Sequence, residues 1–111
     1  MTGNATRFAD VAGVRMAWRE AGSGRPLVLV HGNYGSKRWF EELLRDPLPG
    51  WRLIAPDLPN FAESGTMPEP IGIETYARYL AAFCGELQLE GFALLGHSLG
   101  GAVAQALAVE H

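Results

Sequence analysis

One ten-residue segment carries more structural information than any other part of the chain: Phe92-Ala93-Leu94-Leu95-Gly96-His97-Ser98-Leu99-Gly100-Gly101. It starts with four apolar residues, continues through the pattern glycine, any, serine, any, glycine, and leads into a mostly apolar run that reaches Glu110. A short apolar run joined to a longer one in this way predicts a buried strand that turns sharply into a packed helix.

The spacing of Gly96, Ser98 and Gly100 has a mechanical reason. To turn from strand to helix within about one residue, the chain must hold the serine in a strained backbone conformation. Side chains at positions 96 and 100 would then collide with each other and with nearby backbone, so both positions require glycine. The turn would present the serine hydroxyl above a helix N-terminus, with the amide of Leu99 directed at any negative charge that forms there. A serine that merely caps a helix is the plainer alternative, and the strand-before, helix-after context favours a nucleophile.

A second glycine-containing loop follows the apolar run 27–30 and reads His31-Gly32-Asn33-Tyr34-Gly35. Its glycines would let the loop come close to the serine and turn a second backbone amide toward an oxyanion. That amide would belong to Asn33 or Tyr34, and the residues leave the choice open. Taken alone, an ordinary strand-to-helix turn is the simpler interpretation, but two such loops after two apolar strands favour a common site.

The rest of the chain alternates between strand and helix patterns. Residues 7–11 and 14–20 predict two antiparallel strands that turn at Ala12-Gly13, and short apolar strands are expected at 27–30, 52–55 and 92–95. Helices are expected at 36–45, 73–89 and 99–110, and the proline- and glycine-containing segment 57–72 predicts a long surface loop. Strands that alternate with helices after an opening hairpin indicate an α/β domain with a mostly parallel sheet.

Some individual side chains can also be assigned to the expected core. The helix over 36–45 should bury one apolar side, made of Trp39, Phe40, Leu43 and Leu44. Trp39 and Phe40 are accordingly expected to be core residues rather than a surface for ligand stacking. Cys84 lies on the apolar face of the helix over 73–89, which indicates a small core residue.

Composition excludes several classes of function. The 111 residues carry a net charge of −3 without a basic stripe, which argues against nucleic acid as a partner. No run approaches the roughly 18 apolar residues of a membrane span, and no cluster has the spacing of metal ligands. A single cysteine cannot form an internal disulfide, and the N-terminus lacks the apolar stretch of a signal peptide. We therefore expect a cytoplasmic chain without a metal or other cofactor.

Three motifs together resemble the alpha/beta-hydrolase fold family in its serine-nucleophile branch. They are His31-Gly32, the segment Asp57-Leu58-Pro59-Asn60-Phe61-Ala62-Glu63-Ser64, and the Gly96–Gly101 segment. The resemblance implies an antiparallel hairpin followed by parallel strands, in the order 1-2-4-3-5, with helices on both faces. It also implies that Ser98 is the nucleophile, that Leu99 and Asn33 or Tyr34 form the oxyanion hole, and that Gly32, Gly96 and Gly100 are the loop and elbow glycines. Asn60 and Ala62 depart from the family, which usually has glycine at both positions.

A serine nucleophile needs a base and an acid that orients the base, and neither is evident here. His97 adjoins the serine on the tight turn and should point away from it, His31 should pack within its loop, and His111 should lie about 20 Å along the helix. Asp57 is expected to fix its own loop. Residues 1–111 are therefore interpreted as a partial hydrolase core domain, without the C-terminal strands, the cap, the acid and the histidine.

Two functions follow from this interpretation. The first is hydrolysis of an ester-type bond (carboxylester, lactone or thioester) in a small acyl substrate through a serine acyl-enzyme. The alternative is a catalytically silent or truncated fragment of such an enzyme. The particular substrate stays open.

Overall fold

The chain begins with a β-hairpin whose turn contains only two residues. In the computed structural model, which describes residues 5–33 and 35–110, strand β1 (Arg7–Val11) pairs antiparallel with β2 (Val14–Gly22). Ala12 and Gly13 both have positive φ, of 50° and 86°, which is the backbone of a type I′ turn. The expected hairpin is confirmed, and its second strand extends two residues further than the sequence indicates.

The hairpin continues into a five-stranded sheet with the order β1-β2-β4-β3-β5. Strand β4 (Trp51–Pro56) pairs antiparallel with β2, and β3 (Arg25–Val30) pairs parallel with β4. Strand β5 (Ala93–Gly96) pairs parallel with β3 on its other side. The strand order and the parallel arrangement are those implied by the resemblance.

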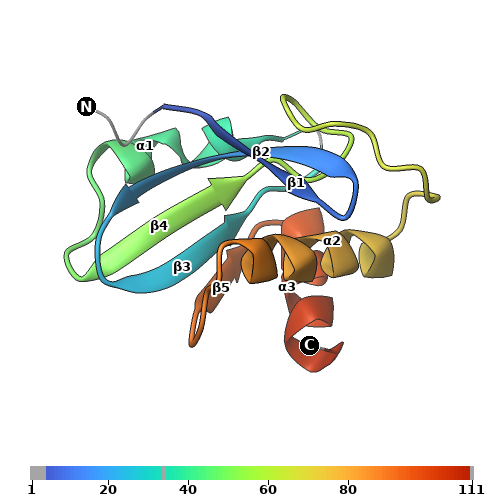
Figure 1. Ribbon diagram of the computed structural model, residues 1–111. Helices are drawn as coiled ribbons and strands as arrows, with labels where there is room; N and C mark the ends of the chain where they lie inside the picture. The colour runs from blue at the N-terminus through green and yellow to red at the C-terminus, as the bar shows by residue number, and fades with distance from the viewer. Residues whose placement is uncertain (1–4, 34, 111) are drawn as a thin grey trace.

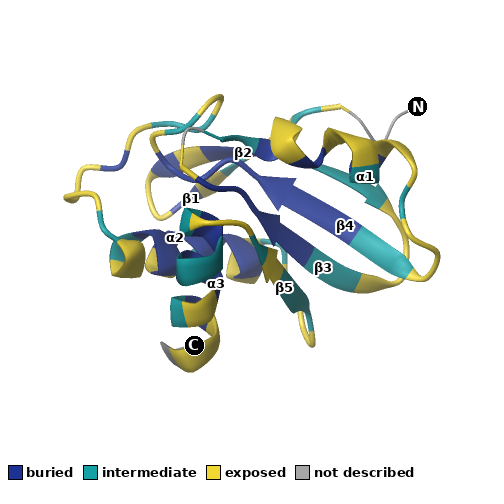
Figure 2. Ribbon diagram, turned by 180° about the vertical axis from the view of Figure 1, so that it is seen from behind, coloured by how far each residue is buried: buried dark blue, intermediate teal, exposed yellow. Residues whose placement is uncertain are grey.

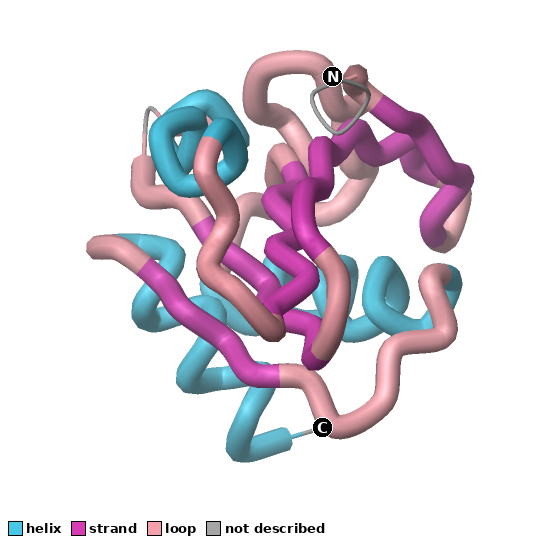
Figure 3. The backbone as a smooth tube through the Cα atoms, turned by 90° about the vertical axis from the view of Figure 1, so that its left-hand side faces the viewer, coloured by secondary structure: helices cyan, strands magenta, loops and turns pink. Residues whose placement is uncertain are grey.

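Helices cover both faces of the sheet (Figure 1). Helices α2 (Ile73–Glu86) and α3 (Leu99–Glu110) pack together on one face, over a core that contains Met16, Val28, Ile54, Leu80, Phe83 and Val103. The opposite face carries the short helix α1 (Glu41–Arg45) and a smaller core of Leu29, Phe40, Leu44, Leu53 and Ala55. Figure 3 shows the two helical layers on either side of the sheet.

The helix expected over 36–45 is not one continuous helix. A 3-10 turn, η2 (Lys37–Phe40), precedes α1, and the Ser36 hydroxyl caps it by accepting a hydrogen bond from the Arg38 amide at 3.1 Å. Because a 3-10 turn places positions i and i+3 on the same side, Lys37 and Phe40 are buried together. Trp39 points outward and is 59% exposed. The assignment of Trp39 to the core is therefore wrong.

Two further expectations need correction. Helix α2 ends at Glu86 rather than Leu89, because Gln88 adopts a left-handed conformation with φ of 56°. Strand β5, expected to be buried, is only partly so, and Leu95 is 43% exposed at what is an edge of the described sheet. Figure 2 shows the contrast between the buried central strand β4 and the more exposed β5.

Two other expectations hold. The segment 57–72 contains neither helix nor strand. Cys84 is 3% exposed, and burial raises the pKa of its thiol to about 12. The thiol is therefore protonated at neutral pH, in keeping with a packing role.

Candidate active site

The turn between β5 and α3, which we call the elbow, passes sharply from strand to helix with left-handed backbone at its serine. Ser98 has φ of 58°, a strained value for a residue other than glycine, and its side chain is exposed. A Cβ at Gly96 would overlap the Gly100 carbonyl, and a Cβ at Gly100 would overlap the Val30 carbonyl. The crowding expected at both glycines is thus present, and it comes from the sheet as well as from the turn itself.

The amides around Ser98 divide into bonded and free groups. Gly100 N–H donates to the His97 carbonyl and Gly101 N–H to the Ser98 carbonyl, each at 2.9 Å. Within residues 5–33 and 35–110, the Leu99 amide donates no hydrogen bond. It lies at the N-terminus of α3, where unpaired amides favour negative charge.

The loop after β3 lies directly against this elbow. A Cβ at Gly32 would be 2.9 Å from the His97 carbonyl oxygen and 3.1 Å from Ser98 Cβ, so only glycine fits there without displacement. Asn33, the next residue, is exposed, and its amide makes no hydrogen bond to any described residue. Tyr34, the other candidate for the second amide, lies outside the described residues.

His31 ties this loop to the loop after β4. Its Nε2 accepts a hydrogen bond from the Leu58 amide at 3.0 Å, and its Nδ1 lies 2.8 Å from the Gly32 carbonyl oxygen. The first bond needs an unprotonated Nε2, so Nδ1 carries the proton and donates to Gly32. The imidazole is fully buried, and burial lowers its pKa. His31 is therefore a neutral packing residue with both ring nitrogens engaged, as expected.

A buried ion pair forms a second tie between the same loops. The Lys37 ammonium lies 2.6 Å from Asp57 Oδ2 and 2.5 Å from Glu63 Oε1. The side chains of Lys37 and Asp57 are at most 1% exposed. Asp57 also accepts hydrogen bonds from the amides of Lys37 at 2.7 Å and Glu63 at 3.2 Å. The hydrogen bond from Lys37 lowers the pKa of the Glu63 carboxyl. Asp57 thus fixes its own loop, as expected, and holds the start of η2 as well.

The two departures from the family's glycine pattern both adopt left-handed backbone. Asn60 has φ of 77° and Ala62 has φ of 47°, and the Asn60 side chain accepts a hydrogen bond from the Met67 amide at 3.0 Å. Asparagine tolerates this region, whereas alanine is strained there. The loop keeps a glycine-like path at the cost of strain at Ala62.

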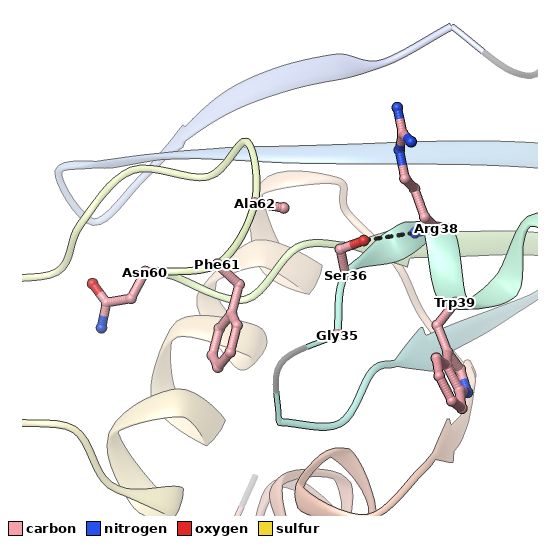
Figure 4. Close-up of a pocket in the computed structure, with 7 residues that line it drawn as sticks. All are labelled: Gly35, Ser36, Arg38, Trp39, Asn60, Phe61 and Ala62. Atoms are coloured by element: carbon pink, nitrogen blue, oxygen red, sulfur yellow. Dashed lines mark hydrogen bonds between the residues drawn. The ribbon is translucent and has the colours of Figure 1, made fainter.

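An open cleft of about 670 Å³ lies between the loop that follows β3 and the loop that follows β4. Its lining residues are Gly35, Ser36, Arg38, Trp39, Asn60, Phe61 and Ala62. In Figure 4 the Phe61 and Trp39 side chains flank the Gly35 backbone and point the same way, whereas Arg38 points away from them. The Trp39 ring stacks on His97, with ring centroids 4.8 Å apart. An aromatic surface therefore adjoins the residue that precedes Ser98.

No base for Ser98 is evident among the described histidines. His31 is buried with both nitrogens engaged, and the His97 ring lies against Trp39. His111 lies outside the described residues. Over the described part of the chain, no group of three His, Cys, Asp or Glu side chains could hold a metal ion, and no helix is long and apolar enough to cross a membrane.

Lys37 is the residue that sequence reasoning missed. It was noticeable only as a basic residue after Gly35-Ser36, and a phosphate loop is excluded because the glycines there are too closely spaced. Its partner Asp57 lies 20 positions later, and no local pattern predicts that the two meet. The neighbouring residues Arg38, Trp39 and Phe40 do not distinguish Lys37 as the buried basic residue.

A mixed sheet whose fifth strand turns into a helix through an exposed, left-handed serine is the architecture of hydrolases built on an α/β sheet. The family model described as "alpha/beta hydrolase fold" matches residues 25–111. The chain therefore belongs to the alpha/beta hydrolase fold family.

Several known proteins are similar over most of this chain. The "Dihydrolipoyllysine-residue acetyltransferase component of acetoin cleaving system" of Cupriavidus necator is 36% identical over 109 residues, which cover 96% of this chain and 29% of that protein. The structure of the epoxide hydrolase CorEH is 30% identical with a TM-score of 0.88, covering 94% of this chain and 37% of that one. The N-acyl homoserine lactonase AidH, complexed with N-butanoyl homoserine, is 30% identical with a TM-score of 0.88, covering 95% and 40%. The chain thus spans about a third of the length of the proteins it matches.

Proposed function

We propose that this chain carries the nucleophile and the oxyanion hole of a hydrolase that cleaves ester-type bonds in small acyl substrates. The observation that carries the proposal is the contact between the two loops at Ser98. An exposed serine with left-handed backbone lies against Gly32, and the amides of Leu99 and Asn33 next to them are free of bonds to described residues. Tyr34 stays the alternative source of the second amide.

In this reaction Ser98 Oγ attacks the acyl carbon, and its proton passes to a base. The carbonyl oxygen takes up the negative charge, which the amides of Leu99 and Asn33 or Tyr34 stabilise, at about 10²–10³ in rate for each donor. The carbon–oxygen or carbon–sulfur bond then breaks, and the leaving group departs with a proton. Water hydrolyses the acyl-enzyme by the reverse sequence.

The similar proteins are named for more than one class of cleaved bond. The lactonase among the similar structures is named for a cyclic ester, whereas the epoxide hydrolase is named for a different bond. Ser98 favours the acyl route, because a serine nucleophile reacts through an acyl-enzyme. The cleft beside Trp39 and Phe61 supports a substrate with apolar parts.

Fluorophosphonate labelling tests the nucleophile. We would label the 111-residue chain, and any longer product of the same reading frame, as wild type, as Ser98→Ala and as Ser23→Ala, which removes an exposed serine elsewhere. Labelling should be lost in Ser98→Ala and unchanged in Ser23→Ala. Labelling of the wild type that persists in Ser98→Ala would show that the nucleophile is assigned wrongly.

A second candidate is that these 111 residues are catalytically silent by themselves, as part of a hydrolase core domain. The arrangement of the two described histidines favours it, since both ring nitrogens of His31 are engaged and the His97 ring lies against Trp39. In that case the chain alone should show neither labelling nor ester turnover. Cooperative unfolding together with Ser98-dependent turnover of the chain alone would rule this candidate out.

A further inference from the structure

The loop that follows β3 is held at both of its ends by consecutive residues of a single distant segment. At the first end, the Leu58 amide donates to His31 Nε2 at 3.0 Å. At the other end, Asp57 accepts from the Lys37 amide at 2.7 Å and from the Lys37 ammonium at 2.6 Å. Residues 32–36 therefore run between two fixed points, both of them at the carboxyl end of β4.

The segment that provides these fixed points is itself rigidly placed. The Asp57 amide donates to the Ala17 carbonyl on β2 at 2.8 Å. The Ser64 hydroxyl donates to the Asp57 carbonyl at 2.7 Å and accepts from the Ala17 amide at 2.9 Å. The loop that follows β3 is thus held in place relative to the sheet, through the segment after β4 and its hydrogen bonds to β2.

A buried ion pair at Lys37 is not needed to fill the space between the two loops. Removing a lysine and an aspartate from water is costly, and an apolar pair of similar volume commonly gives equal or greater stability. Directed hydrogen bonds, however, fix a position in a way that apolar contacts do not. Lys37 makes two such bonds to Asp57, one from its backbone and one from its side chain, and a third to Glu63.

The fixed segment contains the second candidate oxyanion amide. Gly32 contacts the elbow, Asn33 follows it, and Gly35 N–H donates back to the Gly32 carbonyl at 3.0 Å. A donor placed for a developing oxyanion must stay within hydrogen-bond range of one point, and loss of that placement lowers kcat. A loop held only by its glycines would leave that amide free to move.

We propose that Lys37, held by Asp57 and Glu63, is a positioning residue that keeps the 32–36 loop and its backbone amide directed at Ser98. The inference rests on the proposed function, because the placement of this amide affects catalysis only if Ser98 is the nucleophile. Lys37 acts through the loop and does not itself touch the reacting atoms.

The test removes the buried ion pair, and its double variant leaves no unpaired charge of that pair behind. Lys37→Met removes the ammonium, and the double variant Lys37→Met with Asp57→Asn also removes the buried carboxylate while keeping an oxygen for the amide of residue 37. The matched control is Arg45→Met, which breaks an exposed ion pair with Glu41 (3.2 Å) away from both loops. The double variant keeps the test usable if the single variant fails to fold.

The first readout is independent of activity. Hydrogen exchange of the Gly35 amide reports whether the loop holds its bond to Gly32. We expect about a tenfold or larger increase in the double variant, with unchanged exchange at Leu53 in β4 and no change at either amide in Arg45→Met. Unchanged exchange at Gly35 would overturn the proposal.

The second readout is turnover of a small ester by the longest active product of the reading frame. We expect kcat of the double variant to fall by about tenfold or more at nearly constant KM, as a fraction of what one oxyanion donor supplies. A loosened loop with unchanged kcat would overturn the positioning role. If the wild-type protein shows no Ser98-dependent turnover, the proposed function fails, whereas the exchange measurement still decides whether Lys37 holds the loop.

Discussion

His31 illustrates how burial defines the state of a single residue. Its ring is inaccessible to solvent and must accept a hydrogen bond at Nε2, so folding favours the neutral imidazole. Burial is the largest cause of its lowered pKa, and the nearby Lys37 ammonium lowers the pKa further. The Gly32 carbonyl and the Asp57 carboxylate act in the opposite direction and raise it. The unfolded chain therefore binds a proton at this residue at a higher pH than the folded chain does.

This difference predicts a pH dependence of stability. Well above pH 6.5, the ordinary pKa of histidine, His31 is neutral in both states and contributes no slope. As the pH falls below that value the unfolded state gains the proton first, so the free energy of unfolding should decrease by up to about 1.4 kcal/mol per pH unit. Urea unfolding between pH 7.5 and pH 5 measures this slope.

The control for this prediction is a second histidine. His31→Gln should remove most of the slope, whereas His97→Gln, at an exposed position, should keep it. The carboxyls of Glu20 and Glu63 have pKa values lowered below the ordinary 4.5, so their titration falls below the tested range. A slope that persists in His31→Gln would show that another group is responsible.

Single residues differ in how well the sequence predicts them. The left-handed backbone of Ser98 follows from glycines two positions to either side, because the strain and its relief are both local. The burial of Lys37 could not be predicted, because it depends on a carboxylate 20 positions away. Trp39 was assigned wrongly for a related reason, since hydrophobicity alone does not tell on which side of a 3-10 turn a residue lies.

At the scale of elements, the turn of the opening hairpin contains an unfavourable residue. Its two-residue turn needs positive φ at both positions, and alanine occupies the first, with φ of 50°. Type I′ turns favour asparagine followed by glycine, because asparagine adopts this backbone with less strain than alanine.

Ala12→Asn should therefore stabilise the protein. We expect a gain of about 0.5–1 kcal/mol, since the left-handed region costs an ordinary residue about 1–2 kcal/mol. The midpoint of urea unfolding measures the gain. Asp10→Asn introduces the same side chain at an exposed strand position and should leave stability nearly unchanged. Equal effects of the two substitutions would contradict the turn argument.

The sequence predicts the bounds of the other elements with unequal success. The helix α3 begins and ends at the expected residues, because a long apolar run after a glycine turn leaves little choice. The segment before β4 was expected as one helix and is a 3-10 turn followed by a single short helix. The hydrogen bonds of Asp57 to Lys37 hold the start of that turn, and such a tertiary contact lies outside any local pattern.

At the scale of the whole molecule, β5 is the feature with the clearest consequence. Within the described residues it forms one edge of the sheet, and Leu95 on it is 43% exposed. An exposed apolar edge strand presents unpaired backbone groups to other molecules. We therefore expect the 111-residue chain to self-associate through β5 as its concentration rises.

Sedimentation velocity over a concentration series tests this expectation. Leu95→Lys should shift the chain toward the monomer, because a charged side chain at an edge opposes strand pairing. Ile71→Lys removes a more exposed apolar residue from a loop and should change the association little. Loss of association in both variants would indicate a general hydrophobic effect, and unchanged association in Leu95→Lys would show that the edge is not responsible.

Local spacing in the chain was sufficient for the hairpin, the alternation of strands with helices, and the glycine–serine–glycine turn, since each depends on neighbours within a few positions. The pairing of Lys37 with Asp57 and the bond from Leu58 to His31 were decided only by the folded molecule. The physical reason is that a buried hydrogen bond or ion pair is specified by the positions of two distant groups and by the exclusion of water. Both arise only when the sheet brings the ends of β3, β4 and β5 together.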